Sequence, residues 1–274
     1  MPRPLIPVLA VLIGSVACNG AELPWVLIDD FESDLEHWTI IDAENNTDPH
    51  VPDPQVTEIR SDSEAGNHFM LKKPAADGVV GNRKAITIRP LPITVDIGET
   101  YTFFTRINVE YFPNNHSFGL ANVPGADIAS EHYDSFEPMI RITDKLESDG
   151  YKNNGTLQVL GGGDMRYSYI VNPASGEPAN QMEPGVWYQV WYVVNNATLE
   201  EGGQSYDLYV QGGEFETRQL VYEGAKFRMQ RELPLTFFMA ICNTGPHDAP
   251  YGNGGVRYDD IYMARGRTLS SPLQ

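Results

Sequence analysis

The chain has 274 residues, a formal net charge of −18 at pH 7 and an isoelectric point near 4.6. This acidity argues against nucleic acids and anionic membrane surfaces as partners. The two cysteines, Cys18 and Cys242, cannot form a disulfide framework, so stability must come from a core that a chain of this length can bury.

The first seventeen residues have the pattern of a secretory signal. Arg3 precedes an apolar run from Leu5 to Ala17 that ends in the small residues a signal peptidase reads. The run is too short to span a bilayer, although it could instead be a buried N-terminal strand. We predict a signal peptide at 1–17, a single β-sandwich domain at 22–274, and a secreted, periplasmic or cell-surface location. Cys18 follows the cleavage site directly and is a possible lipid anchor. No later apolar run is long enough to be a membrane span.

Strand signals then recur along the chain, with almost no helical periodicity. Short β-branched and aromatic runs lie between Gly, Pro, Asn and Asp residues, which predicts strands. We expect strands at 101–112, 138–143, 156–160, 167–171, 187–195, 206–211, 235–243 and 256–264. The absence of helices between strands argues against a parallel α/β fold, and no repeat is visible. The pattern predicts an all-β fold, a two-sheet antiparallel sandwich or jelly roll.

Alternation predicts a polar and aromatic face on these strands. If Tyr188 faces the core, then Gln189 and Trp191 point outward, and on other strands Arg106, Asn108 and Tyr209 do the same. Aromatic rings cover the apolar face of a pyranose, while amides and guanidinium groups bind its hydroxyls. This face predicts a sugar groove. The alternative is that the tryptophans lie in the core of a sheet covered on both sides.

Three segments carry a family resemblance. The hairpin from Trp187 to Gly213 resembles that of laminin-G-like, concanavalin A-like sandwiches. The opening Ile28-Asp29-Asp30-Phe31-Glu32 and the late Tyr258-Asp259-Asp260-Ile261-Tyr262 resemble the ends of bacterial carbohydrate-binding jelly rolls. The resemblance implies that the first and last strands lie side by side and share a structural calcium ion. Its ligands would be Asp30, Glu32 and Asp259. The alternative is that these carboxylates are strand-edge charges that prevent edge pairing.

Catalytic residues follow from two chemistries. A glycosidase needs two carboxylates beside the scissile bond, and the Glu-x-Asp-x-x-Glu pattern of related glucanases is absent. A lyase acting on uronic acids needs a carboxylate neutraliser, a base and an acid. The motifs of jelly-roll alginate lyases have only a partial counterpart in Arg60-Ser61-Asp62-Ser63, and Gln-Ile/Val-His is missing. The catalytic candidates are Arg106, His116, Arg141 and Tyr167. The substrate-binding candidates are Asn108, Gln158, Gln189, Trp191 and Tyr209.

Other chemistries find little support, because the six histidines form no HExxH motif and no GxSxG elbow occurs. The leading hypothesis is an extracellular protein that binds a polysaccharide in a groove on one sheet. The first alternative is a jelly-roll lyase that cleaves a uronic-acid polymer by β-elimination. The second alternative is a structural or adhesion protein whose sandwich binds another protein.

Overall fold

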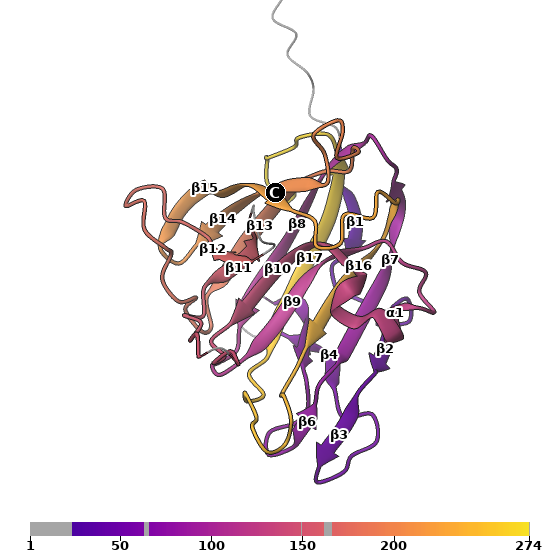
Figure 1. Cartoon of the computed structure of the whole chain (residues 1–274), viewed down its shortest axis with the longest axis vertical. Coiled ribbons are helices and arrows are strands. Elements are labelled where there is room, and N and C mark those ends of the chain that lie inside the picture. The colour runs from indigo at the N-terminus through magenta and orange to yellow at the C-terminus, as the bar shows by residue number, and fades with distance from the viewer. Residues whose placement is uncertain (1–23, 63–65, 149, 162–165, 274) are drawn as a thin grey trace, which may run out of the picture.

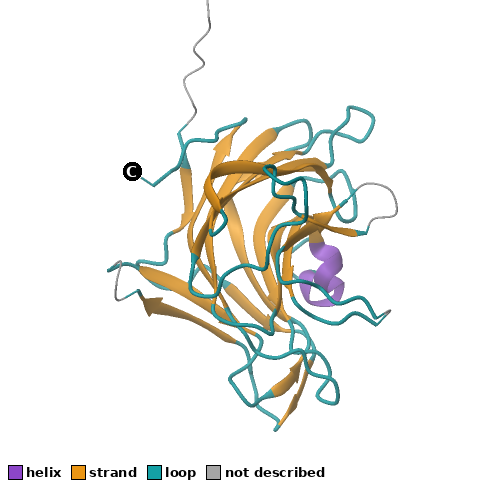
Figure 2. Ribbon diagram, turned by 90° about the vertical axis from the view of Figure 1, so that its left-hand side faces the viewer, coloured by secondary structure: helices purple, strands orange, loops and turns teal. Residues whose placement is uncertain are grey.

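A computed structural model describes residues 24–62, 66–148, 150–161 and 166–273, and shows two curved antiparallel sheets packed face to face (Figures 1 and 2). This confirms the predicted all-β sandwich. The signal peptide at 1–17 and the possible lipid anchor at Cys18 lie outside the described residues, so export and lipidation stay predictions. Within the described ranges, no helix is both long and apolar enough to cross a membrane.

The first sheet, here called sheet A, has eight strands. Seven lie in the order β15-β14-β13-β8-β17-β5-β4, and β1 pairs with β17. Their bounds are β15 (Phe215–Lys226), β14 (Ser205–Gly212), β13 (Trp187–Asn195), β8 (Thr100–Val109), β17 (Val256–Arg265), β5 (His68–Lys73), β4 (Val56–Ser61) and β1 (Val26–Asp29).

The second sheet, sheet B, has seven strands in the order β12-β11-β10-β9-β16-β7-β2. Their bounds are β12 (Tyr167–Tyr169), β11 (Leu157–Leu160), β10 (Phe136–Thr143), β9 (Asn115–Ala121), β16 (Leu235–Cys242), β7 (Ala85–Val95) and β2 (Thr39–Asp42). A separate pair, β3 (Asn45–Asp48) and β6 (Val80–Asn82), extends from one end (Figure 1). A short helix, α1 (Ile128–Glu131), and the 3₁₀ turn η1 (His132–Ser135) precede β10.

The main core lies between the two sheets and obeys the predicted alternation. On β13 the side chains of Tyr188, Val190, Tyr192 and Val194 are buried in it, together with Phe103 and Ile107 of β8. Gln189 and Trp191 therefore point away from the core, as predicted, and their register places Gln189 opposite Arg106. The sequence pattern thus assigned the sides of these strands correctly.

Several strands escaped prediction because their pattern is not amphipathic. Every residue of β9 is buried, since the core covers one side and α1 with its neighbours covers part of the other. Two-sided burial removes the alternation on which strand prediction relies. The long strand β7 contains Pro90 and Pro92, which sequence rules associate with strand breaks, and its pairing with β16 shifts register near Pro90.

The two ends of the domain meet, as the resemblance implied. β1 pairs antiparallel with the second half of β17, with Leu27 opposite Tyr262 and Asp29 opposite Ile261. The pairing leaves the acidic residues of both segments near one another. The calcium prediction can therefore be compared with the positions of these carboxylates.

Candidate functional site

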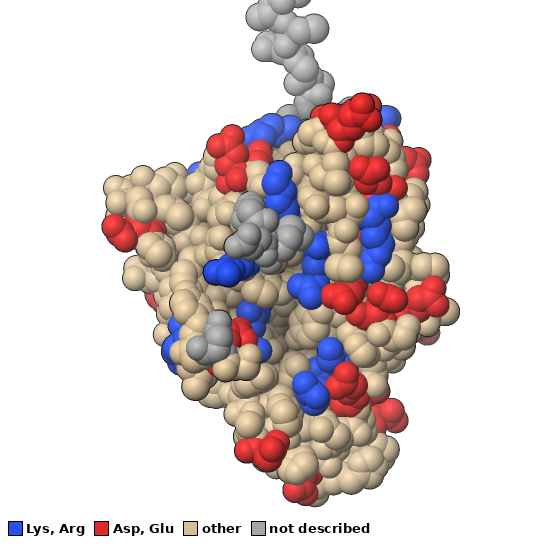
Figure 3. Space-filling model, in the orientation of Figure 1, with Lys and Arg blue, Asp and Glu red and all other residues tan. Residues whose placement is uncertain are grey.

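A groove of about 1050 Å³ lies on the outer face of sheet B, away from the sandwich core. Its floor is formed by β9, β10 and β11, and its walls by η1, β12 and the segments around 145–153 and 228. Figure 3 shows this face, with lysine and arginine side chains around a hollow near its centre. The lining residues are Lys84, Asn115, Glu131, His132, Tyr133, Asp134, Arg141, Lys145, Glu147, Ser148, Tyr151, Asn153, Gln158, Arg166, Tyr167, Arg228 and Asn243.

Three buried polar side chains form the floor of the groove. Arg141 of β10 lies opposite Gln158 of β11 in the sheet register, and its Nη2 lies 3.5 Å from Asn115 Oδ1 of β9. Arg141 Nη2 also donates to Glu147 Oε1 at 2.6 Å. Gln158 Nε2 donates to Asn153 Oδ1 at 2.6 Å. Neighbouring strands and these bonds therefore fix a guanidinium and two amides in place.

Tyrosine side chains line the walls, each beside a cation. The Arg141 guanidinium lies 4.7 Å from the centre of the Tyr167 ring, and Lys84 Nζ lies 5.0 Å from that of Tyr133. The Tyr167 hydroxyl accepts a hydrogen bond from Arg228 Nη1 at 3.1 Å. Burial raises the pKa of Tyr133 far above its ordinary value, so this phenol stays protonated at neutral pH. The walls thus offer rings for stacking and hydroxyls for proton transfer.

The groove is richer in cations than the chain as a whole. Its lining has five lysine and arginine residues and three carboxylates, although the net charge of the chain is −18. Each of the three carboxylates also has a cationic partner, as in the contact of Lys145 Nζ with Glu147 at 2.5 Å. Burial raises the pKa of Glu147, but Lys145 and Arg141 outweigh it and lower the pKa. The groove is therefore suited to an anionic ligand.

His132 is a groove residue with an unusual backbone. Its φ of 50° and ψ of −117° lie outside the regions that side-chain-bearing residues favour, and it joins α1 to η1. Burial lowers the pKa of its imidazole, and Lys84 lowers it further. The ring is therefore neutral at pH 7 and can accept a proton. Backbone strain of this kind is concentrated at functional sites in proteins.

The structure divides the predicted site residues between the two sheets. Arg141, Gln158 and Tyr167 come together in the groove on sheet B. The other outward-facing candidates lie on the outer face of sheet A and cannot act with them: Arg106, Asn108, Gln189, Trp191 and Tyr209. Alternation along a strand shows which residues share a side, but it does not show to which sheet the strand belongs.

The outer face of sheet A is covered where sugar stacking was expected. Trp191 is fully buried, and its Nε1 donates to the carbonyl oxygen of Ser270 at 3.2 Å. Leu269 and Leu273 of the C-terminal segment and Trp25 near the N-terminus pack on the cluster around Trp191. The prediction of a platform formed by Trp191 and Tyr209 is therefore wrong, and the alternative of a tryptophan covered on both sides is confirmed.

His116 and Asn108 are also inaccessible. His116 is fully buried on the core side of β9, with Nε2 at 2.9 Å from the carbonyl oxygen of Gly254. Burial lowers its pKa to about 3. Asn108 is fully buried on β8. Neither side chain can contact a polysaccharide in this structure, so the catalytic role predicted for His116 has no geometric support.

The calcium site predicted at Asp30, Glu32 and Asp259 stays a prediction. Asp259 pairs with Arg106 and accepts from Asn67 Nδ2 at 2.8 Å, while Glu32 Oε2 lies 2.8 Å from His68 Nδ1. Among the residues that the structure describes, no group of three or more His, Cys, Asp or Glu side chains is arranged to hold a metal ion.

Sequence reasoning missed several groove residues. Asn115 lies in the unpredicted strand β9, and Lys145, Glu147 and Arg228 lie in connections whose paths depend on tertiary contacts. The basic residues after position 140 are a sequence feature that could have indicated the groove. Arg141 lies near the end of β10, and Lys145 follows that strand. The structure also separates the members of the acidic cluster at 131–137. Glu131 and Asp134 lie at the rim of the groove, whereas Glu137 is fully buried.

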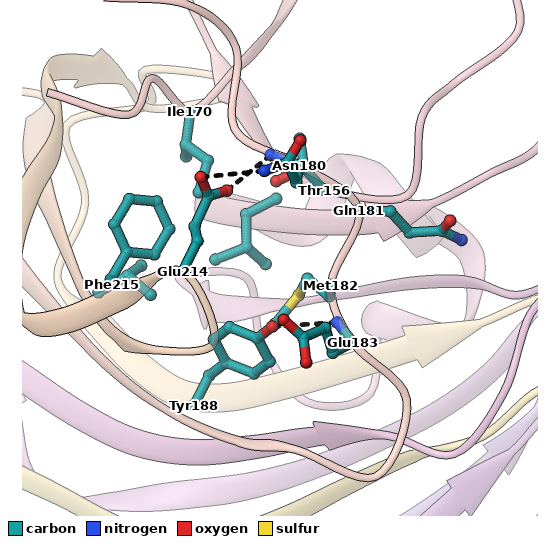
Figure 4. Close-up of a pocket in the computed structure, with 11 residues that line it drawn as sticks. Thr156, Ile170, Asn180, Gln181, Met182, Glu183, Tyr188, Glu214 and Phe215 are labelled. Carbon is teal, nitrogen blue, oxygen red and sulfur yellow. Dashed lines mark hydrogen bonds between the residues drawn. The ribbon is translucent and has the colours of Figure 1, made fainter. Parts of the chain in front are cut away.

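A second, much smaller cavity of about 40 Å³ lies beneath the long loop at 172–184 (Figure 4). Glu214 Oε1 accepts from the backbone N–H of Asn180 at 2.6 Å, and the Tyr188 hydroxyl accepts from that of Glu183 at 3.0 Å. The volume is too small for a sugar ring and suits one or two water molecules. These contacts hold the loop against the sandwich, so the loop is structural at this point.

Comparison with known proteins identifies the fold. No family model and no curated protein sequence matches the chain. The marine PL-14 alginate lyase from Aplysia kurodai is 12% identical, with a TM-score of 0.54 over 90% of this chain and 100% of that chain. The cellulose induced protein Cip1 is 13% identical, with a TM-score of 0.51 over 89% and 99%. The chain therefore shares the fold of these two proteins, a two-sheet antiparallel sandwich of the jelly-roll, concanavalin A-like kind.

Proposed function

We propose that this protein binds an acidic polysaccharide in the groove on sheet B. The observation that carries the proposal is the buried Arg141 guanidinium, with Asn115 and Gln158 beside it, on the floor of a groove in which lysine and arginine residues outnumber carboxylates. A buried arginine beside two amides fits the carboxylate of a uronic acid, because the guanidinium can donate two parallel hydrogen bonds. The acidic surface elsewhere favours binding at this groove over binding across the whole surface.

The tyrosines explain how a sugar chain would lie in the groove. Tyr133 and Tyr167 expose ring surface that can cover the apolar C–H face of a pyranose, while the amides bind hydroxyl groups. The fold shared with a polysaccharide lyase supports the class of ligand only in general terms, since an identity of 12% says nothing of individual residues.

Binding is tested with a panel of glycans. Isothermal titration calorimetry against alginate, polygalacturonate, hyaluronate, xylan and cellulose oligomers should give binding to at least one uronic-acid polymer. The neutral glycans should bind at least about tenfold more weakly, because they cannot pair with the guanidinium. Equal affinity for the neutral glycans, or no binding of any uronic-acid polymer, would reject the proposal.

Mass spectrometry of secreted protein tests export, since an intact Met1 on mature material would contradict cleavage.

A second candidate function is cleavage of the bound polymer by β-elimination. It is favoured by the presence in one groove of a carboxylate neutraliser, Arg141, an imidazole, His132, and two phenols, Tyr133 and Tyr167. In this reaction a base removes the C5 proton, the C4–O bond breaks, a C4=C5 double bond forms, and an acid protonates the leaving oxygen. Ultraviolet absorbance of the unsaturated product detects it directly. If no ultraviolet absorbance develops with any polymer that binds, binding remains the proposed function.

Hydrolysis is less well supported. A retaining or inverting glycosidase needs one carboxylic acid with a raised pKa. The groove carboxylates have cationic partners, and the pKa of Glu147 is lowered. A reducing-sugar assay on neutral glycans, expected to be negative, separates this reaction from elimination.

A further inference from the structure

Arg228 connects the two walls of the groove. It follows β15, and its Nε and Nη2 donate to Asp134 Oδ1 of η1 at 3.1 Å and 2.9 Å. On the opposite wall, its Nη1 donates to the Tyr167 hydroxyl of β12 at 3.1 Å. A single side chain therefore bridges the groove from wall to wall.

The backbone beneath this bridge is firmly held. The fully buried Glu137 carboxylate accepts backbone N–H bonds from Met229, Gln230 and Arg231 at 3.1, 2.8 and 3.3 Å. Its backbone carbonyl accepts from the N–H of Arg228 at 2.9 Å. Successive N–H groups around one buried carboxylate make a strong anchor, because each bond has a charged acceptor. The position of Arg228 is thus set by the fold and not by its exposed ion pair alone.

The outer face of sheet B is covered beyond the bridge. Ile128 of α1 packs with Phe136, Met139 and Met239 in a second apolar cluster on this face. The floor strand β10 therefore passes from the groove at Arg141 to a covered region at its beginning. Arg228 donates to Asp134 of η1, next to this covered region.

We infer that the groove takes the end of a polysaccharide chain, and that Arg228 is the residue that sets this specificity. A groove open at both ends accepts an internal segment, whereas a wall-to-wall bridge leaves room only for a terminal sugar. The Arg228 guanidinium also adds a donor for a hydroxyl or carboxylate on that sugar. The inference rests on the proposed binding of an acidic polysaccharide.

The test uses hexasaccharides prepared from the uronic-acid polymer that binds, in three forms. One form is free, one has a bulky fluorophore at the reducing end, and one has a bulky substituent at the non-reducing end. For the unmodified protein we expect one of the two blocked forms to bind at least about tenfold more weakly than the free form. The other blocked form should bind within about twofold of it.

Arg228→Ala should restore binding of the excluded form to within about threefold of the free form. Arg231→Lys is the matched control, since Arg231 lies in the same segment and pairs with Glu131 and the buried Glu137, and the lysine keeps the positive charge; it should restore nothing. Asp134→Ala releases one end of the bridge at an exposed site where an ion pair adds little stability, and should restore binding in part. Thermal melting of each variant confirms folding.

The possible results distinguish recognition of the chain end from binding of the polysaccharide itself. Equal binding of all three forms by the unmodified protein, or unchanged exclusion in both Arg228→Ala and Asp134→Ala, overturns recognition of the chain end while binding itself stands. Absence of binding by every hexasaccharide and every polymer overturns the proposed function and this inference together.

Discussion

The outer faces of the two sheets begin from similar material and end as different surfaces. Each has an arginine within a strand and an amide nearby: Arg106 with Gln189 on sheet A, and Arg141 with Gln158 on sheet B. On sheet A the C-terminal segment and Trp25 cover the neighbouring aromatic cluster. On sheet B a groove remains open above Arg141. A polar sheet face becomes a binding site only where the rest of the chain leaves it accessible.

The net charge around the two arginines also differs between the two sheets. Arg106 lies between Asp259 and Asp260, with its Nε 2.6 Å from Asp260 Oδ2. Arg141 pairs with Glu147, which is shared with Lys145. The first cluster therefore has more negative than positive charge, and the second has the reverse. Only the second can attract an anionic ligand.

The largest expected effect concerns the covered face. Trp191→Ala should lower the free energy of unfolding by about 3 to 5 kcal/mol, because a fully buried indole leaves a cavity under the C-terminal segment. Denaturant unfolding measures this loss. Glycan affinity of the folded variant should stay within about twofold, and a selective loss of binding would place the site on sheet A instead.

The next effect concerns the open face. Arg141→Ala should weaken binding of the uronic-acid polymer by about a hundredfold, and Arg141→Lys by about tenfold, because lysine cannot donate two parallel bonds. Arg106→Ala and Arg106→Lys are the matched controls, and titration calorimetry should find them unchanged. If the Arg106 variants lose affinity and the Arg141 variants keep it, the comparison of the two faces is reversed.

A smaller effect depends on pH. Burial and the neighbouring Asp260 together raise the pKa of Asp259 to about 7 from the ordinary value of 3.8. A carboxyl that holds its proton more tightly when folded stabilises the protein below the unfolded pKa, and this contribution is lost as pH rises through about 7. The stability of Asp259→Asn relative to the unmodified protein should therefore improve as pH rises from about 4 to 7, by at most about 1.4 kcal/mol per pH unit.

Glu147 on sheet B should give the opposite pH dependence of stability. Its pKa lies below the ordinary 4.5, so its contribution to stability is present above that pH and is lost on acidification. Glu147→Gln should lose its disadvantage relative to the unmodified protein as pH falls below about 4.5. Denaturant unfolding of both variants at several pH values makes the test, and parallel pH dependences would contradict the assigned environments.

The smallest expected effect is that of calcium removal. If Asp30, Glu32 and Asp259 share the structural calcium ion that the resemblance implied, a chelator should lower the melting temperature, because a bound ion stabilises the native state by mass action. The effect should be small, since Arg106 and His68 already pair with Asp259 and Glu32. An unchanged melting temperature in chelator, with no calcium in elemental analysis, would reject the site.

The sequence by itself determined the fold class and the sides of the central strands, and the family resemblance implied the pairing of the first and last strands. Hydrophobic alternation on 187–195 identified the core side correctly, because a strand with one face in the core must repeat with a period of two. The same rule failed for β9, which is buried on both faces. Arg141, Gln158 and Tyr167 were named as site candidates, yet nothing local distinguished them from Arg106 and Trp191.

Only the tertiary structure decided which outward face is a groove. That outcome depends on contacts between distant segments: Ser270 over Trp191 on one sheet, and Arg228 anchored through Glu137 on the other. Such contacts join residues up to about a hundred positions apart and leave no periodic trace in the sequence. Local propensity fixes elements and their sides, whereas the cover over each face follows from how the whole chain packs.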